Sequence, residues 1–223
     1  MELDKKIQHA IEHTKVLRSP EQNLATFGST NIYYYLITEL MDKVNVVREG
    51  RVIAAKPKIV TPSYLINLEG FSGQARRFIE LMESQNPYAP GIFYAYKNEP
   101  REMNIVSEPL EQIINTINQQ IDNQRDPLRA IIIGFEELWD VSLIKFTYEL
   151  TSRSLHQNIA EFQQYGLLKV DEQGVPKHAR EQIEELFKKV KDDPQHASEL
   201  VAELKRWGLF TEYQDRFLNI FRK

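Results

Sequence analysis

The spacing of hydrophobic residues predicts a helix followed by a strand at the start of the chain. Over residues 3–17, apolar side chains gather on one side of a helical wheel, which is typical of an amphipathic helix. Residues 31–40 are dense in β-branched and aromatic side chains and are expected to form a strand. Side chains alternate between the two faces of a strand, so Tyr33 and Tyr35 share one face.

A β-hairpin is predicted next. Residues 44–48 and 51–60 both have strand-like composition. The Glu49-Gly50 pair between them has the form of a tight turn, because glycine tolerates a positive φ. Pro57 cannot donate a backbone hydrogen bond, so we expect the second strand to lie at a sheet edge or to carry a bulge.

Short elements are predicted between this hairpin and residue 106. Residues 61–68 begin with a threonine cap and a proline, a combination typical of a helix start. A second helix is predicted over 73–84, where apolar residues recur at helical spacing. Strands at 92–96 and 103–106 are expected on either side of a turn at 97–100.

From residue 107 the pattern is helical, with one ambiguous segment. Helices are predicted over 109–123, 141–152, 153–165, 175–191, 194–207 and 211–222. The capping pattern favours another helix over 128–139, while the β-branched run Ile131–Ile133 leaves a buried strand open. We therefore expect an α+β protein with a mixed unit over residues 1–106, including a small sheet, and a helical unit over 107–223.

The order of elements over residues 141–174 resembles a winged-helix module. A helix, a turn at Thr151-Ser152, a second helix and a short strand follow one another. In that module the second helix enters the major groove of DNA. Residues 128–174 hold seven acidic and four basic residues, so few groups are available to contact phosphates. A winged-helix DNA-binding regulator is therefore the alternative function rather than the first.

Composition and charge narrow the class of protein. The chain has 223 residues, a net charge of −4 and no cysteine. This length is ample for a packed core, and the lack of cysteine excludes disulfides, a thiol nucleophile and thiolate zinc sites. No apolar run approaches the length of a membrane span, and the first residues do not have the pattern of a targeting segment. We expect a cytoplasmic protein with no membrane partner.

Motifs for catalysis and metal binding are weak. His9 and His13 form an H-x-x-E-H sequence, which in some metalloproteases binds zinc. Here both histidines lie opposite the apolar stripe of the predicted helix, so we expect them to face solvent and to bind no metal. Glycine-rich phosphate-binding motifs are absent. We expect no cofactor and assign no catalytic residue; an unidentified hydrolase is the third functional candidate.

The strongest functional signal is the charge of the predicted hairpin. Residues 43–58 contain five basic residues and one acid. Cations beside aromatic rings can hold phosphates while the rings stack on bases, although lysine and arginine also protect exposed sheet edges. The candidate binding residues are Arg48, Arg51, Lys56, Lys58, Tyr33 and Tyr35. We expect a non-catalytic binding or regulatory protein that docks an acidic partner surface or a nucleic acid, with a second copy of the chain as another partner.

The end of the chain is unusually apolar. Tyr213, Phe217, Ile220 and Phe221 recur at helical spacing and form one stripe. Such a stripe either folds back on its own chain or binds a partner. Two similar segments, 160–167 and 202–209, each end in glycine followed by leucine, which is typical of a helix C-cap.

Overall fold

The computed structural model describes residues 2–66, 80, 83–85 and 88–221. These residues form helices and strands in the mixed α+β proportions that the sequence predicts. The chain divides into two compact units, and each consists of two separate segments. Unit 1 comprises residues 1–57 and 94–160, and unit 2 comprises residues 58–93 and 161–223. The division therefore differs from the single boundary expected near residue 106.

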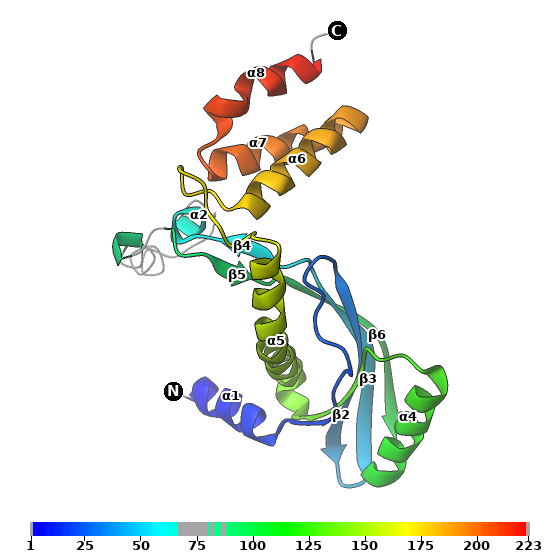
Figure 1. Ribbon diagram of the computed structural model, residues 1–223. Coiled ribbons are helices and arrows are strands. Elements are labelled where there is room, and N and C mark those ends of the chain that lie inside the picture. Colours follow the sequence, from blue (N-terminus) through cyan, green and yellow to red (C-terminus); the bar gives the residue numbers. More distant parts are fainter. Residues whose placement is uncertain (1, 67–79, 81–82, 86–87, 222–223) are drawn as a thin grey trace. The chain divides into compact units, whose positions relative to one another are not determined.

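Unit 1 is built on a five-stranded sheet with the order β1-β7-β2-β3-β6. Figure 1 labels β2, β3 and β6 of this sheet. The strands are β1 (Lys15–Arg18), β2 (Thr30–Met41), β3 (Val44–Ala54), β6 (Tyr96–Val106) and β7 (Arg129–Gly134). β2, β3 and β6 are antiparallel neighbours, whereas β7 runs parallel to β2. The helices α4 (Leu110–Gln124) and α5 (Trp139–Gln164) lie on opposite faces of this sheet (Figure 1).

Each face of the sheet carries its own core. Tyr34 and Leu36 pack with Phe146 of α5 on one face. Tyr35 and Ile37 pack against the buried isoleucines of α4 on the other. Alternate residues of β2 therefore belong to different cores, as the period of a strand requires.

The ambiguous segment 128–139 contains a strand, and the helix favoured by its capping pattern is wrong. Ala130, Ile131 and Ile132 in β7 are all completely buried. A strand of a mixed sheet that is covered by helices on both faces has no polar face, so it appears apolar in every direction. After β7, a short 3₁₀ turn (Glu136–Leu138) leads directly into α5.

The hairpin predicted between residues 44–48 and 51–60 is wrong, because β3 is a single strand that pairs with β2 in a different hairpin. β2 and β3 pair antiparallel, with Met41 opposite Val44 and Lys43 at a φ of 60° in the turn. β3 runs straight through Gly50, so the predicted turn at Glu49-Gly50 is wrong. A Cβ at Gly50 would lie 2.5 Å from the Tyr34 hydroxyl, which explains the glycine by close approach of a side chain.

The turn predicted at residues 97–100 is also wrong, because these residues belong to β6. β6 is the last strand of the sheet, and an edge strand tolerates Pro100. Glu49 pairs with Glu102 while Gly50 pairs with Pro100. Arg101 is therefore an extra residue, which forms a β-bulge.

Two helices have different bounds from those predicted. α1 (Glu2–His13) is shorter than expected, since residues 15–18 form β1 against β7. α5 continues through Thr151-Ser152, so the helix-turn-helix of the winged-helix outline is not present. The Thr151 and Ser154 hydroxyls donate to the carbonyls four residues earlier, at 2.6 and 2.7 Å. Such bonds satisfy hydroxyl groups within a helix and remove the need for a turn.

Unit 2 combines a two-stranded sheet with a group of helices. Its elements are β4 (Lys58–Val60), α2 (Pro62–Ile66), β5 (Gly91–Phe93), a 3₁₀ turn (Pro194–His196), α6 (Lys177–Asp192), α7 (Ala197–Arg206) and α8 (Phe210–Phe221). α2 begins at the proline that the sequence indicates. The predicted end of that helix near residue 68 and nearly all of the helix predicted over 73–84 lie outside the described residues. No described helix is long and apolar enough to cross a membrane.

The apolar stripe at the chain end folds back on its own unit. Tyr213, Phe217 and Ile220 of α8 pack against a core formed by residues of α6 and α7. Phe221 remains about half exposed. The Gly166 and Gly208 segments both end helices as predicted, with positive φ and the two hydrogen bonds of a Schellman cap.

We expect Gly50→Ala to lower the free energy of unfolding by about 1–3 kcal/mol, because the added methyl group overlaps the Tyr34 side chain and the Glu99 carbonyl. Urea denaturation followed by circular dichroism measures this change. Gly28→Ala is the matched control, since a Cβ at Gly28 meets no atom within 4 Å. Equal stability of the two variants would show that Tyr34 has room to move.

We expect Phe217→Ala to lower the free energy of unfolding by about 2 kcal/mol, because the ring packs against the core of unit 2. Leu218→Ala is the control, since this neighbouring side chain is exposed and should contribute less than about 1 kcal/mol. Thermal unfolding of both variants gives the comparison. A Phe217→Ala variant as stable as the control would mean that α8 does not stabilise its unit.

Candidate functional site

The six binding residues predicted from the sequence do not form one surface. Arg51 lies opposite Tyr33 in the sheet, on the face that also carries Tyr35. Arg48 lies opposite Leu36, on the other face. Lys56 follows the end of β3, and Lys58 begins β4 in unit 2.

Both predicted arginines are neutralised by carboxylates of their own chain. Arg48 donates two hydrogen bonds to Glu136, at 2.8 and 2.6 Å, and its guanidinium lies 5.3 Å from the Trp139 ring centre. Arg51 donates to Glu99 at 2.7 Å. The Arg48–Glu136 pair is bidentate and therefore geometrically specific, and both pairs leave little charge for a ligand.

The two predicted tyrosines are also occupied. Arg101 and Arg129 lie over the Tyr33 ring, 5.2 and 5.0 Å from its centre. The Tyr35 ring is buried, and its hydroxyl accepts a hydrogen bond from Arg129 at 3.2 Å. Burial also raises the pKa of the Tyr35 hydroxyl. Neither ring is presented as a platform on which a base could stack.

A pocket with polar and apolar walls lies where β2 and β7 end. Its volume is about 420 Å³. It is lined by His13, Ile37, Thr38, Glu39, Leu40, Met41, Asn45, Leu110, Ile133, Gly134, Phe135 and Glu136. β2 and β7 are parallel, and in α/β sheets ligands bind beyond the carboxyl ends of parallel strands. The position of the pocket in the sheet is therefore one that commonly serves binding.

Thr38, Arg48 and Glu136 form a hydrogen-bonded network at this pocket. Thr38 is completely buried, and its hydroxyl donates to Glu136 while Arg48 donates to Thr38 at 2.8 Å. The hydrogen bonds from Arg48 hold the pKa of the Glu136 carboxyl below its usual value. Glu136 is therefore an ionised group held in one orientation at the wall of the pocket.

Buried hydroxyl groups hold the chain that leads from β7 into α5. Ser142 Oγ accepts hydrogen bonds from the Thr14 hydroxyl, at 2.7 Å, and from the Phe135 amide, at 3.2 Å. A Cβ at Gly134 would lie 2.8 Å from Ser142, so only glycine allows this approach. These contacts position Phe135 and Glu136 beside the pocket.

The histidines of α1 lie at the rim of this site. His13 lines the pocket and stacks on His9, with ring centres 3.8 Å apart. His9 in turn meets the edge of the Phe135 ring at 5.0 Å. Both imidazoles are exposed, as the helical wheel predicts. Within the described parts of the chain no three potential metal ligands of the His, Cys, Asp or Glu type come together.

Sequence reasoning missed Thr38, Glu136 and Asn45. The acidic group at 136–140 has the pattern of a solvated helix end, and Glu137 does pair with Lys6 at an exposed position. Glu136 differs because it follows β7 directly, and its side chain is only 26% exposed. A correct assignment of β7 as a strand would have placed this carboxylate at the carboxyl end of the sheet.

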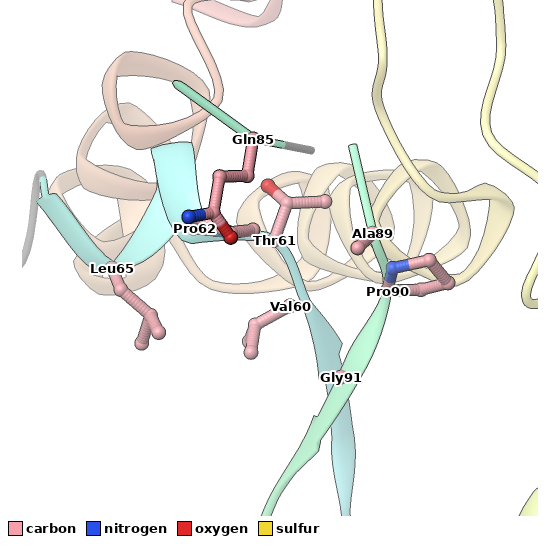
Figure 2. A pocket seen from close by; sticks show the side chains of 8 residues that line it. All are labelled: Val60, Thr61, Pro62, Leu65, Gln85, Ala89, Pro90 and Gly91. Carbon is pink, nitrogen blue, oxygen red and sulfur yellow. The ribbon is translucent and has the colours of Figure 1, made fainter. Parts of the chain in front are cut away.

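Unit 2 contains a second, more apolar pocket of about 310 Å³. Figure 2 shows its lining, in which Val60 and Leu65 come from β4 and α2, and Ala89 and Pro90 come from the segment before β5. Thr61 and Gln85 supply its polar side chains. The described lining has no charged group, so it offers less chemical selectivity than the pocket of unit 1.

We expect Glu136→Gln to lower the free energy of unfolding by about 1–2 kcal/mol near pH 7, because Arg48 loses its charged partner. The folded-state pKa of Glu136 is lowered, so the ion pair stabilises the protein above the ordinary glutamate pKa. This stabilisation is lost as the pH falls through the folded-state pKa. The difference from wild type in urea denaturation should therefore shrink as the pH falls below the ordinary glutamate pKa.

The control for this measurement is Glu137→Gln, which removes only an exposed pair with Lys6. Its effect should stay below about 0.5 kcal/mol at either pH. A Glu136→Gln variant whose stability matches this control near pH 7 would show that the buried network does not stabilise the fold.

Comparisons with known proteins do not assign a function to this chain. Searches against protein-family models, curated proteins and solved structures found no significant match. The pocket of unit 1 and its hydrogen-bonded network are the features that indicate a function.

Proposed function

We propose that this protein is a non-catalytic binding protein whose N-terminal unit binds a small ligand in the pocket beyond β2 and β7. The observation that carries this proposal is the position of a fixed, ionised carboxylate, Glu136, in the wall of the pocket of about 420 Å³ in unit 1. Ligand sites typically combine apolar walls with a few oriented polar groups. This pocket has both.

The charge of the lining favours a ligand with a cationic head and an apolar body. Glu39 and Glu136 both line the pocket. Arg48 compensates Glu136, whereas Glu39 has no ion pair with any described residue. The remaining negative charge attracts a cation, and Leu110, Ile133 and Phe135 supply apolar contact.

The bonding of the network supports binding rather than catalysis. The Thr38 hydroxyl donates a hydrogen bond to Glu136, and the Arg48 guanidinium donates hydrogen bonds to both Thr38 and Glu136. Groups that satisfy one another in this way hold a wall in position, while a nucleophile needs an adjacent base to activate it. The network is therefore assigned a positioning role.

The class of function is the one expected from the sequence, but the site is different. Docking through the hairpin relied on free cations, and Arg48 and Arg51 are both paired within the chain. The winged-helix alternative relied on a turn at Thr151-Ser152, where α5 is continuous. Ligand binding in the pocket of unit 1 requires neither free cations on the hairpin nor a turn within α5.

Benzylamine and benzoate are suitable probes, since they share an apolar ring and carry opposite charges. We expect benzylamine to shift the backbone amide resonances of Thr38, Gly134 and Phe135 in a ¹H–¹⁵N NMR titration, with a Kd of about 1 mM for so small a ligand. Benzoate should shift them much less, because the uncompensated charge of Glu39 repels it.

Leu110→Trp tests the position of the site by filling the pocket from α4. This variant should abolish the benzylamine shifts while its circular dichroism stays unchanged. Leu218→Trp is the matched control in unit 2, where an exposed leucine is enlarged without touching the pocket. Equal shifts with benzoate would contradict the proposed charge selectivity, and unchanged binding by Leu110→Trp would contradict the site.

A further inference from the structure

No described strand pairs with the side of the edge strand β6 that faces away from β3. β6 pairs with β3 on one side and is the last strand in the sheet order. All of its side chains are exposed except those of Glu99 and Val106, which are half-buried. A free edge can pair with a further strand through its backbone.

The middle of this edge carries two adjacent charges of opposite sign, Arg101 and Glu102, for which the described residues provide no ion partner. Lys97 and Glu99 pair with each other, and Glu99 also pairs with Arg51. Arg101 and Glu102 make no ion pair within 4 Å with any other described residue. Glu102 is instead directly opposite Glu49 on β3, and like charges at such positions are unfavourable.

The bulge at Arg101 places these two charges on the same face of the sheet. Glu102 pairs with Glu49, which belongs to the face that carries Tyr35. Arg101 lies over the Tyr33 ring, which is also on that face. Both charges therefore lie on the α4 side of the sheet, although they are neighbours in sequence.

We infer that β6 pairs antiparallel with β6 of a second copy of this chain, about a two-fold axis between Arg101 and Glu102. In this register each Arg101 lies opposite Glu102 of the other copy, which forms two ion pairs and gives both Glu102 carboxylates a cation. The interface is self-complementary, as a two-fold dimer requires. The proposal is independent of ligand binding in the pocket beyond β2 and β7.

The same register matches the other face of the strand. Met103 and Ile105 are each 63% exposed, and they lie on the α5 side, opposite Arg48 and Val46. Pairing about the proposed axis sets Met103 opposite Pro100 of the second copy. Pro100 and Met103 line a cavity of about 200 Å³ together with Tyr34 and Trp139. Methionine is unbranched and fits irregular cavities, so the incoming Met103 has a place to pack.

The charge pattern selects this partner over a generic strand. Lysine, charged residues and proline on an edge discourage unspecific pairing, and β6 contains Lys97 and Pro100. A strand that places a negative group opposite Arg101 and a positive group opposite Glu102 can still pair with β6, because its charges attract those of the edge. The antiparallel copy of β6 supplies both groups at the required positions.

Charge reversal and charge exchange test the register directly. Wild type should be dimeric in sedimentation velocity, and Arg101→Glu should raise the dimer Kd about tenfold or more, because two attractive pairs become repulsive. The double variant Arg101→Glu, Glu102→Arg should restore the dimer, since the exchanged charges again lie opposite one another. Lys188→Glu in α6 is a control for the change in net charge.

The outcomes separate this proposal from its competitors. A wild-type chain that stays monomeric up to about 100 µM overturns it. A dimer that Arg101→Glu and the double variant leave unchanged shows a different interface, which also overturns it. Loss of the dimer in Arg101→Glu without recovery in the double variant contradicts the register. Circular dichroism of each variant confirms folding, and benzylamine titration of the monomeric variant reports separately on the pocket.

Discussion

The parallel pairing of β7 with β2 is the contact on which unit 1 depends. β7 lies between β1 and β2 and is completely buried at Ala130, Ile131 and Ile132. Ile131 contributes to the core beneath α4, and Ile132 contributes to the core beneath α5. One short strand thus joins both helical layers to the sheet. It also ends at Gly134, so the pocket and its network exist only because β7 is held in this register.

Secondary structure was predicted correctly where the sequence pattern fits only one kind of element. It was predicted wrongly where a helix and a strand would give the same pattern. β2 and α4 were predicted almost to the residue because alternation and helical spacing are distinct. Residues 128–139 were assigned to a helix because a strand buried on both faces has no alternation to detect. Gly50 suggested a turn, although the reason for the glycine is the Tyr34 side chain across the sheet. That contact is long-range and leaves no local signal.

The candidate site was less predictable than the fold for a related reason. Local charge density singled out Arg48 and Arg51, but it could not show that Glu136 and Glu99, which are distant in sequence, neutralise them. Glu136 has acidic neighbours in the sequence, and one of them, Glu137, is exposed, so local sequence does not distinguish it. Whether a charge is free or paired depends on strand register, and the register follows from burial of β7 and from the bulge at Arg101. The amino-acid composition reveals neither the burial of β7 nor the bulge at Arg101.

The position of β7 between β1 and β2 has a consequence for synthesis on the ribosome. β2 and β3 can form their hairpin as soon as they emerge, but β7 is made more than seventy residues after β3 ends. Until then, one edge of β2 is unpaired, β1 has no neighbour, and apolar side chains on both faces of the hairpin are open to water. Pairings of such long sequence separation form slowly and leave intermediates prone to aggregation. We therefore expect the nascent chain to pass through a stage in which it is more prone to aggregation than the finished protein.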